Sequence, residues 1–152
     1  MFKFKFFIKV VVMLKILEYS ITHFCEHILR LHIEEAQDIS GELYGASISI
    51  EGKSEGECNF YLFFPKEFLK EIADILVNNA KFKEDDWCDL TKECANQIIG
   101  YAKNLLNDAR GDEEYKLGIP EYLGKVDFSE IVLDEALTYK FENCYFRIGY
   151  CK

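Results

Sequence analysis

The chain has 152 residues, 49% of them hydrophobic and 15% aromatic, which is enough for one domain with a sizeable buried core. Its formal net charge is −9, so it has no basic surface to neutralise the phosphates of nucleic acid or of an anionic membrane. These numbers argue against nucleic acid and anionic membranes as partners. They favour a partner protein whose surface is basic or mixed in charge.

Residues 1–13 combine Phe, Ile and Val with several lysines. Lys9 interrupts the apolar run and no small-residue cleavage site follows, so we do not expect a signal peptide. Two interpretations remain open. The segment is an extra β-strand, because these residue types favour strands, or an extension that precedes the true start at Met13. The domain itself is expected over residues 14–152.

Apolar residues recur with helical spacing over residues 14–31 and predict a helix, which a polar loop follows up to Gly41. Polar and apolar residues then alternate over 44–50, and a second apolar run covers 59–64. The glycine-containing segment 51–57 between them predicts a turn, so the two strands should form a hairpin.

Pro65 is expected to open the next helix, which should end near Asn78 and Asn79. Asp85 and Asp86 suit the start of a long helix, because acidic side chains cap helix N-termini and favour the helix dipole. This helix should end near Ala109.

Gly111 is a suitable stop for the long helix, and Gly118 and Pro120 indicate a loop. Strands are predicted over 137–142 and 144–151, joined by a tight turn. The order of elements predicts a single α/β (α+β) domain, in two or three layers, with a mostly antiparallel sheet packed against long helices.

The long helix has one apolar stripe and one polar face. Glu93 and Asn96, three residues apart, should point outward together from this rigid element. Asn is a poor residue for the middle of a helix, because its side chain competes for backbone hydrogen bonds. Orienting a water molecule or a ligand would explain why it is there. The stripe consists of Leu90, Cys94, Ala95, Ile98, Ile99, Tyr101, Ala102, Leu105 and Leu106.

Asp89, Glu93 and Asn96 on this helix, followed by Pro120, resemble the signature of the CheC/CheX/FliY chemotaxis phosphatases. The hairpin, the Phe-Pro start of the following helix, and Gly100 later in the signature helix are similar to the CheX branch. The 23 residues between Asn96 and Pro120 are one more than in the family pattern, a difference that a surface loop tolerates. The N-terminal helix carries no second signature, which again fits CheX.

The resemblance implies a CheC-like domain that dephosphorylates the aspartyl phosphate of a CheY-like response regulator. By this resemblance Asn96 would orient the attacking water and Glu93 would pair with a lysine of the regulator. Asp89 and Pro120 would shape the helix start and an adjoining loop. The protein would need no cofactor of its own, because Mg²⁺ arrives on the regulator. The alternative is a non-catalytic module that binds a response regulator or a flagellar-switch component.

The family also implies a cytoplasmic homodimer built by joining or exchanging sheet strands. The C-terminal strands, rich in Tyr, Phe and Ile, could supply the edge for such pairing.

His23, Glu26 and His27 spell H-x-x-E-H, a pattern of zinc peptidases. Two histidines at i and i+4 could share a metal, with the glutamate as base. The pattern is short and no third ligand can be identified, so we expect ordinary surface histidines and no metal site.

The six cysteines form no C-x-x-C pair, so we expect reduced thiols in a reducing compartment. Several of them occupy apolar positions of the predicted elements, where a free thiol packs like a small hydrophobic group. They are Cys25, Cys58, Cys88, Cys94, Cys144 and Cys151.

Overall fold

A computed structural model describes residues 2–53, 56–77, 81–110 and 114–152. Three α-helices, two short helices of other types and seven strands are present in this part of the chain. In chain order they are α1 (Phe2–Thr22), the π-helix η1 (His23–Ile28), β1 (Glu34–Ala36), β2 (Leu43–Gly52), β3 (Gly56–Phe64), α2 (Lys66–Leu76), α3 (Glu84–Arg110), β4 (Tyr115–Leu117), β5 (Glu121–Val126), the 3-10 helix η2 (Phe128–Glu130), β6 (Glu135–Phe141) and β7 (Cys144–Cys151).

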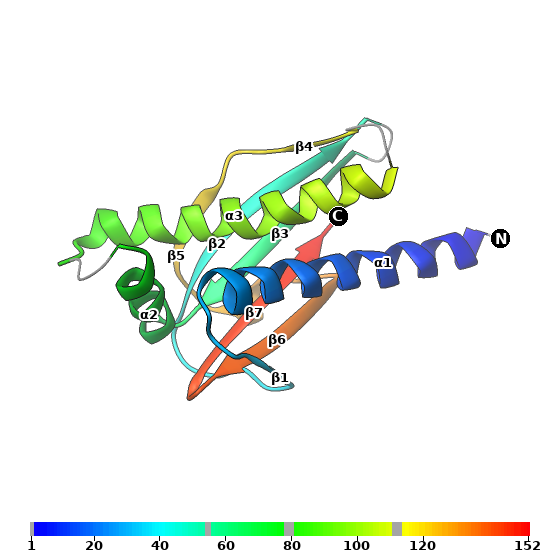
Figure 1. The fold of residues 1–152 in the computed structure, drawn as a ribbon. Helices are drawn as coiled ribbons and strands as arrows, with labels where there is room; N and C mark the ends of the chain where they lie inside the picture. Colours follow the sequence, from blue (N-terminus) through cyan, green and yellow to red (C-terminus); the bar gives the residue numbers. More distant parts are fainter. Residues whose placement is uncertain (1, 54–55, 78–80, 111–113) are drawn as a thin grey trace.

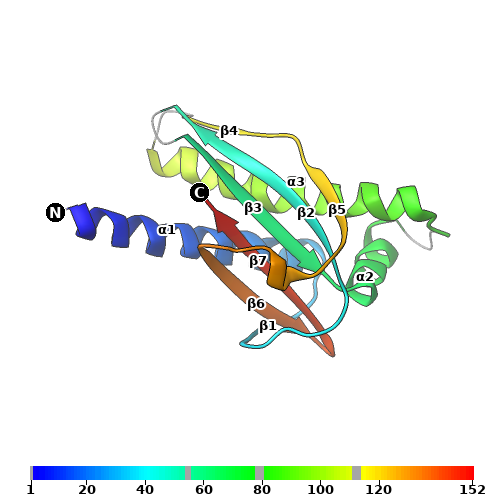
Figure 2. The same cartoon turned by 180° about the vertical axis from the view of Figure 1, so that it is seen from behind.

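The described strands form one antiparallel sheet with the order β1-β6-β7-β3-β2-β4, and β5 also pairs with β2. The three α-helices lie on one face of this sheet (Figure 1). The view from behind shows the opposite face, over which η2 crosses (Figure 2). The molecule is therefore a two-layer α+β domain with a mostly antiparallel sheet, as the order of elements predicts.

The hydrophobic core fills the space between the helices and the sheet. Alternate residues of β2 and β3 point into this space. Apolar residues at helical spacing on α1, α2 and α3 cover it from the other side. Its largest fully buried side chains are Phe24, Phe60, Phe64, Phe68 and Phe146.

The two predicted hairpins are confirmed. Strands β2 and β3 pair from Tyr44 with Phe64 to Gly52 with Gly56, so the strands extend further into the expected turn than the sequence indicated. Strands β6 and β7 pair down to Phe141 with Cys144. Glu142 has a φ of 53°, the left-handed conformation that a two-residue hairpin turn requires.

Of the two interpretations of the N-terminal segment, the extra β-strand is wrong, because residues 2–13 continue α1 upstream. The helix is already nucleated by the residues from Leu14 onward, which pack against the sheet. Adding residues to an existing helix forms one hydrogen bond per residue, whereas a strand would need a free neighbour in the sheet.

The expected role of the C-terminal strands as a free sheet edge is also wrong. β7 lies between β3 and β6, and β1 pairs with Thr138, Tyr139 and Lys140 of β6. The edges of the sheet are instead the three-residue β1 and the β4–β5 side. Strand β1 was not evident from the sequence, and neither was the pairing of β4 and β5 with β2.

The starts of α2 and α3 follow the prediction. Pro65 precedes α2 as its N-cap, and Asp86 accepts a hydrogen bond from the backbone N–H of Lys83 at 2.8 Å. This is the return half of a capping box, with the acidic residue at the third helical position. α2 ends at Leu76, close to its predicted end, and α3 is described as far as Arg110, beside its predicted end near Ala109. Asn78, Asn79 and Gly111 themselves lie outside the described residues.

Candidate functional site

Helix α3 separates a buried face from an exposed one, as its periodicity predicts. Leu90, Cys94 and Ile98 are buried, whereas Glu93 is exposed and Asn96 is half-buried. Two side chains three residues apart on a helix are neighbours on its surface. The structure therefore brings Glu93 and Asn96 together as an outward-facing pair.

Glu93 has a neighbour that the sequence analysis missed. Gln97 Nε2 donates a hydrogen bond to Glu93 Oε1 at 3.2 Å, across one helical turn. The i, i+4 spacing was the signal that could have revealed this contact. Within the described part of the chain, no side chain bonds the amide of Asn96, so its donors and its acceptor are available to a ligand.

The core beneath the pair is apolar and rigid. Cys94 lies between Glu93 and Asn96 in the sequence but is 1% exposed, and burial raises the pKa of its thiol to about 12. The charge of Glu93 raises this pKa further, by disfavouring a second negative charge nearby. The thiol is therefore a packing group, and the polar chemistry of this segment belongs to the exposed Glu93 and the half-buried Asn96.

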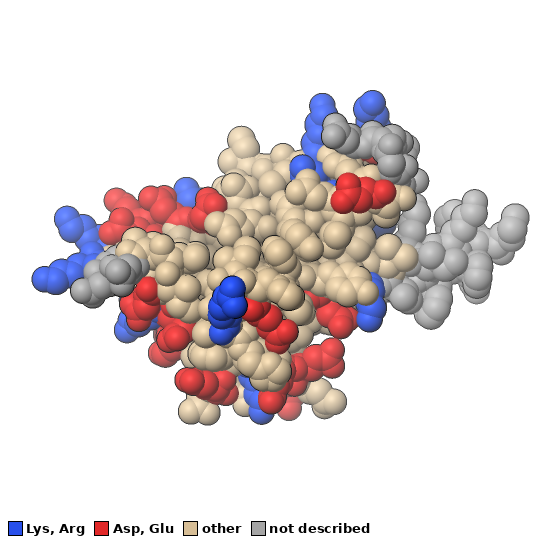
Figure 3. All heavy atoms as spheres, viewed as in Figure 1, with Lys and Arg blue, Asp and Glu red and all other residues tan. Residues whose placement is uncertain are grey.

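Asp89 lies within the helix, after its first turn. It is a full turn inside α3, its side chain is 77% exposed, and its carboxylate pairs with Lys92 Nζ at 3.8 Å. The capping at the start of the helix comes from Asp86, as predicted, and the expected role of Asp89 in shaping the helix start stays a prediction. Asp89 is one of several acidic residues over the N-terminal half of α3, where Figure 3 shows them gathered.

Gly100 and Pro120, the remaining predicted residues, lie where α3 meets the β4–β5 edge. A Cβ built at Gly100 would be 3.5 Å from Leu117 Cδ2, an ordinary van der Waals distance, so β4 packs beside this turn of the helix. Pro120 belongs to the short connection between β4 and β5, as predicted. This connection is held to the sheet by Gly118, whose N–H donates to Ser49 O at 2.8 Å.

A shallow pocket lies at the N-terminal end of α3, and sequence analysis did not identify it. Lys66 Nζ lies over the Trp87 ring at 5.8 Å from its centroid. Burial raises the pKa of the Tyr122 hydroxyl, and the charge of Glu84 adds to the effect. The pocket is lined by Tyr44, Lys66, Leu69, Glu84, Trp87 and Tyr122.

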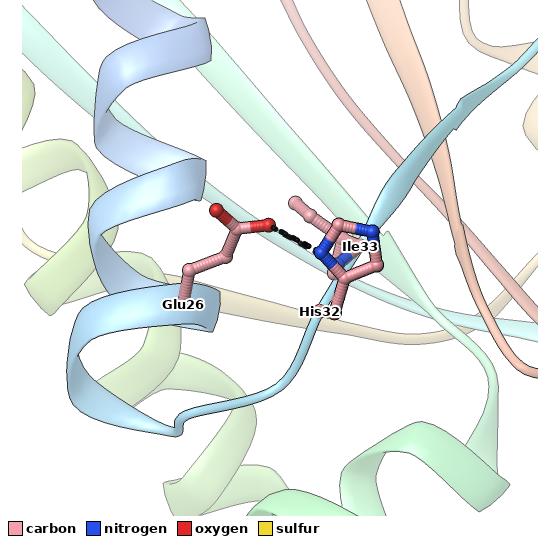
Figure 4. Close-up of polar contacts among 3 residues, drawn as sticks. All are labelled: Glu26, His32 and Ile33. Carbon is pink, nitrogen blue, oxygen red and sulfur yellow. Dashed lines mark hydrogen bonds and ion pairs between the residues drawn. The ribbon is translucent and has the colours of Figure 1, made fainter.

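The H-x-x-E-H segment forms η1 and has structural partners. His23 stacks on Tyr101 of α3, with ring centroids 4.1 Å apart. Glu26 turns toward the following loop, where its carboxylate accepts the N–H of Ile33 at 3.3 Å and lies 3.4 Å from His32 Nδ1 (Figure 4). Among the residues that the structure describes, no three His, Cys, Asp or Glu side chains are placed to share a metal ion.

All six cysteines are free thiols, and Cys25, Cys58 and Cys94 are buried. None of the helices in the described part of the chain has the length and apolar character that crossing a bilayer requires.

The arrangement on α3 limits the chemistry that this site can perform. An amide can donate to one group and accept from another, so it can hold a water molecule in a set direction. A carboxylate accepts only, and it pairs with a cation. Such a site can position reactants on a partner without forming a covalent intermediate of its own.

Comparison with solved structures defines the fold class. The CheX protein of Vibrio vulnificus has a TM-score of 0.71 at 13% identity, covering 91% of this chain and 99% of that one. A complex of CheX with CheY, BeF3 and Mg²⁺ from Borrelia burgdorferi has a TM-score of 0.65 at 13% identity, covering 91% and 97%. Thermotoga maritima FliY has 0.51 at 17% identity, covering 85% and 81%. The chain therefore has a CheC-like α+β fold.

The sequence itself matches the family model "Chemotaxis phosphatase CheX" over residues 44–142. This stretch holds β2, β3, α2, α3 and the β4–β5 edge, and with them the whole predicted signature. The chain belongs to the CheX family. No curated protein matches it.

Proposed function

We propose that the protein is a phosphatase that removes the phosphoryl group from the aspartyl phosphate of a CheY-like response regulator. One observation carries the proposal: Glu93 and Asn96 form an outward-facing pair on a rigid helix of a CheX-family domain. We infer that the protein acts in the cytoplasm, where response regulators are phosphorylated.

Asn96 would hold the attacking water. Aspartyl phosphate hydrolyses when water attacks phosphorus in line with the leaving carboxylate, so the catalyst mainly has to position the water and exclude other geometries. A neutral amide can approach a phosphoryl anion without electrostatic repulsion. The amide of Asn96, which no side chain of the described residues bonds, suits this role. The apolar packing around Cys94 holds the backbone of this helical turn in place.

Glu93 would fix the orientation of the bound regulator. A carboxylate beside a phosphoryl anion is repelled unless it pairs with a cation, so the expected partner is a lysine of the regulator. In the free protein Gln97 already bonds Glu93, which limits the rotamers that its carboxylate can adopt. The acidic residues around it would help to attract a basic surface.

The metal would come with the substrate. The neighbour from Borrelia burgdorferi is a complex that contains CheY, BeF3 and Mg²⁺. We propose that Mg²⁺ likewise reaches this protein on the phosphorylated regulator. Asp89, Gly100 and Pro120 would support the site rather than take part in the chemistry, because they set the surface of α3 and the adjoining edge.

Phosphate release from a labelled response regulator tests the proposal. Catalytic amounts of the wild type should accelerate release over many turnovers, and Asn96→Ala and Glu93→Ala should remove the acceleration. If the wild type binds the regulator and does not accelerate release, the protein is a non-catalytic binding module instead. The variants must keep the wild-type circular dichroism spectrum for the comparison to hold.

The homodimer remains a proposal. Strand joining would have to use the β1 edge or the β4–β5 edge, since the C-terminal strands are interior or partly covered. Light scattering at micromolar concentration tests it, and a monomer mass would count against it.

A further inference from the structure

Ile119 is an apolar side chain that the fold leaves in water. It is 90% exposed and lies in the connection between β4 and β5. Removing such a side chain from water is favourable, so the isolated domain gains little from its present position. An isoleucine placed this way suits contact with another molecule.

The backbone on both sides holds Ile119 in place. Leu117 pairs with Ile50 of β2, and Glu121 pairs with Ser47. Residues 118–120 therefore run opposite only two residues of β2, and the extra residue bulges outward, as in a β-bulge. Pro120 also restricts the preceding residue to extended conformations. Ile119 therefore lies in a segment whose backbone is already held in place, which lowers the conformational entropy lost on binding.

This segment runs beside the Glu93–Asn96 pair. At one end Leu117 contacts Gly100, and at the other Tyr122 shares a pocket with Trp87. The helix spans about 20 Å between those two levels, and five strand residues span about 16 Å. Interpolation places residues 119 and 120 level with the turn that carries Glu93 and Asn96. Both ribbon views show the β4–β5 edge lying alongside α3 (Figures 1 and 2).

We propose that Ile119 is an apolar docking contact for the receiver domain of the phosphorylated response regulator. A standard interface buries about 800 Å² on each partner, a patch of roughly 16 Å radius. A regulator centred on Asn96 would therefore cover an element packed directly against α3. The inference rests on the proposed function, and it assigns to the regulator an apolar surface next to its phosphorylation site. It names a specificity contact that lies outside the catalytic helix.

The chain offers a matched control for testing Ile119. Val132 is 81% exposed, is also β-branched, and lies in a loop, but on the far side of the sheet. Its neighbour Leu133 contacts the position of Gly149, whose sequence neighbours Ile148 and Tyr150 face the helices. Ile119→Thr and Val132→Thr remove similar apolar area from the two sides of the molecule.

The experiment measures binding to the BeF3-activated regulator with Mg²⁺, together with turnover of the phosphorylated regulator. We expect Ile119→Thr to raise Kd and KM roughly ten-fold with kcat unchanged at saturation, and Val132→Thr to match the wild type. Ile119→Asp should weaken binding further, and because the site is exposed both variants should keep the wild-type Tm.

Equal Kd values for the wild type, Ile119→Thr and Ile119→Asp would overturn the docking role while leaving the phosphatase assignment intact. A wild type that neither binds nor dephosphorylates the regulator would overturn the proposed function and the docking role together.

Discussion

Gly100 of α3 lies directly against Leu117 of β4, since a Cβ at the glycine would be 3.5 Å from Leu117 Cδ2. The β4–β5 edge therefore packs beside the helix that carries Glu93 and Asn96. The helix and the edge together form the surface that a regulator would meet.

Gly100→Ala should stabilise the protein. The position is inside a helix, and the added methyl would meet Leu117 at an ordinary van der Waals distance. Alanine in a helix interior is about 0.5–1 kcal/mol more favourable than glycine. Urea unfolding should show an increase of this size in the free energy of unfolding. A decrease would mean that β4 packs more tightly against α3 than the structure indicates.

Asn107 should prove important for holding β4 against α3. Its Nδ2 donates to Tyr115 O at 3.0 Å, and its Oδ1 accepts from Tyr115 N at 2.8 Å. Asn107→Ala should lower the free energy of unfolding by about 1–3 kcal/mol, because partly buried backbone groups lose their partner. Asn104→Ala, at an exposed position of the same helix, is the control and should change it by less than about 0.5 kcal/mol.

The buried thiol of Cys94 should make stability fall at alkaline pH. Its pKa is about 12 in the folded protein and 9.0 as an ordinary thiol, so from pH 9 to 12 only the unfolded chain releases this proton. The free energy of unfolding should then decrease by about 1.4 kcal/mol per pH unit from this group. Below pH 9 the thiol makes no pH-dependent contribution.

Cys94→Ala supplies the readout for that prediction. Denaturant unfolding at several pH values should give a shallower decline for the variant than for the wild type over the same window. Cys25 and Cys58, whose pKa values burial also raises, keep contributing in both proteins. Equal slopes would show that the Cys94 thiol ionises as easily in the folded protein as in the unfolded chain.

Glu93→Gln should affect binding more than the chemical step. It keeps the shape of the side chain but removes the charge that would pair with a regulator lysine, and charged hydrogen bonds contribute about 1.5–3 kcal/mol. We expect KM to rise roughly ten-fold or more. We also expect KM of the variant to change less with salt concentration than KM of the wild type. Asp108→Asn removes a similar charge from the far end of α3 and should leave KM unchanged. A fall in kcat without a change in KM would contradict this role.

Much of the fold was predictable because its signals are local. The alternation over β2 and β3, Pro65 before α2, and the apolar repeat of α3 each depend on neighbouring residues in the sequence. The strands β1 and β4 have three residues each and gain their hydrogen bonds from distant partners. Their pairing could not be predicted from local pattern, and the same is true of the continuation of α1 through residues that favour strands.

The site, too, has a part that could be predicted from the sequence and a part that could not. The exposure of Glu93 and the buried position of Cys94 follow from helical periodicity, and the resemblance supplied their expected roles. The position of Ile119 beside them depends on the register of β4 and β5 against β2, which sequence spacing does not determine. Sequence analysis therefore singled out Glu93 and Asn96, the pair whose catalytic role is proposed here, but not Ile119 at the edge next to them.

The most direct test of the central claim is the rate of phosphate release from a saturating phosphorylated regulator, with Asn96→Ala compared against Asn104→Ala. Both variants remove an asparagine amide from the solvent side of α3, and neither side chain packs in the core. We expect Asn96→Ala to lower kcat by about 100-fold or more, because the water is no longer positioned, while Asn104→Ala retains the wild-type rate. Wild-type kcat in the Asn96→Ala variant would contradict the central claim.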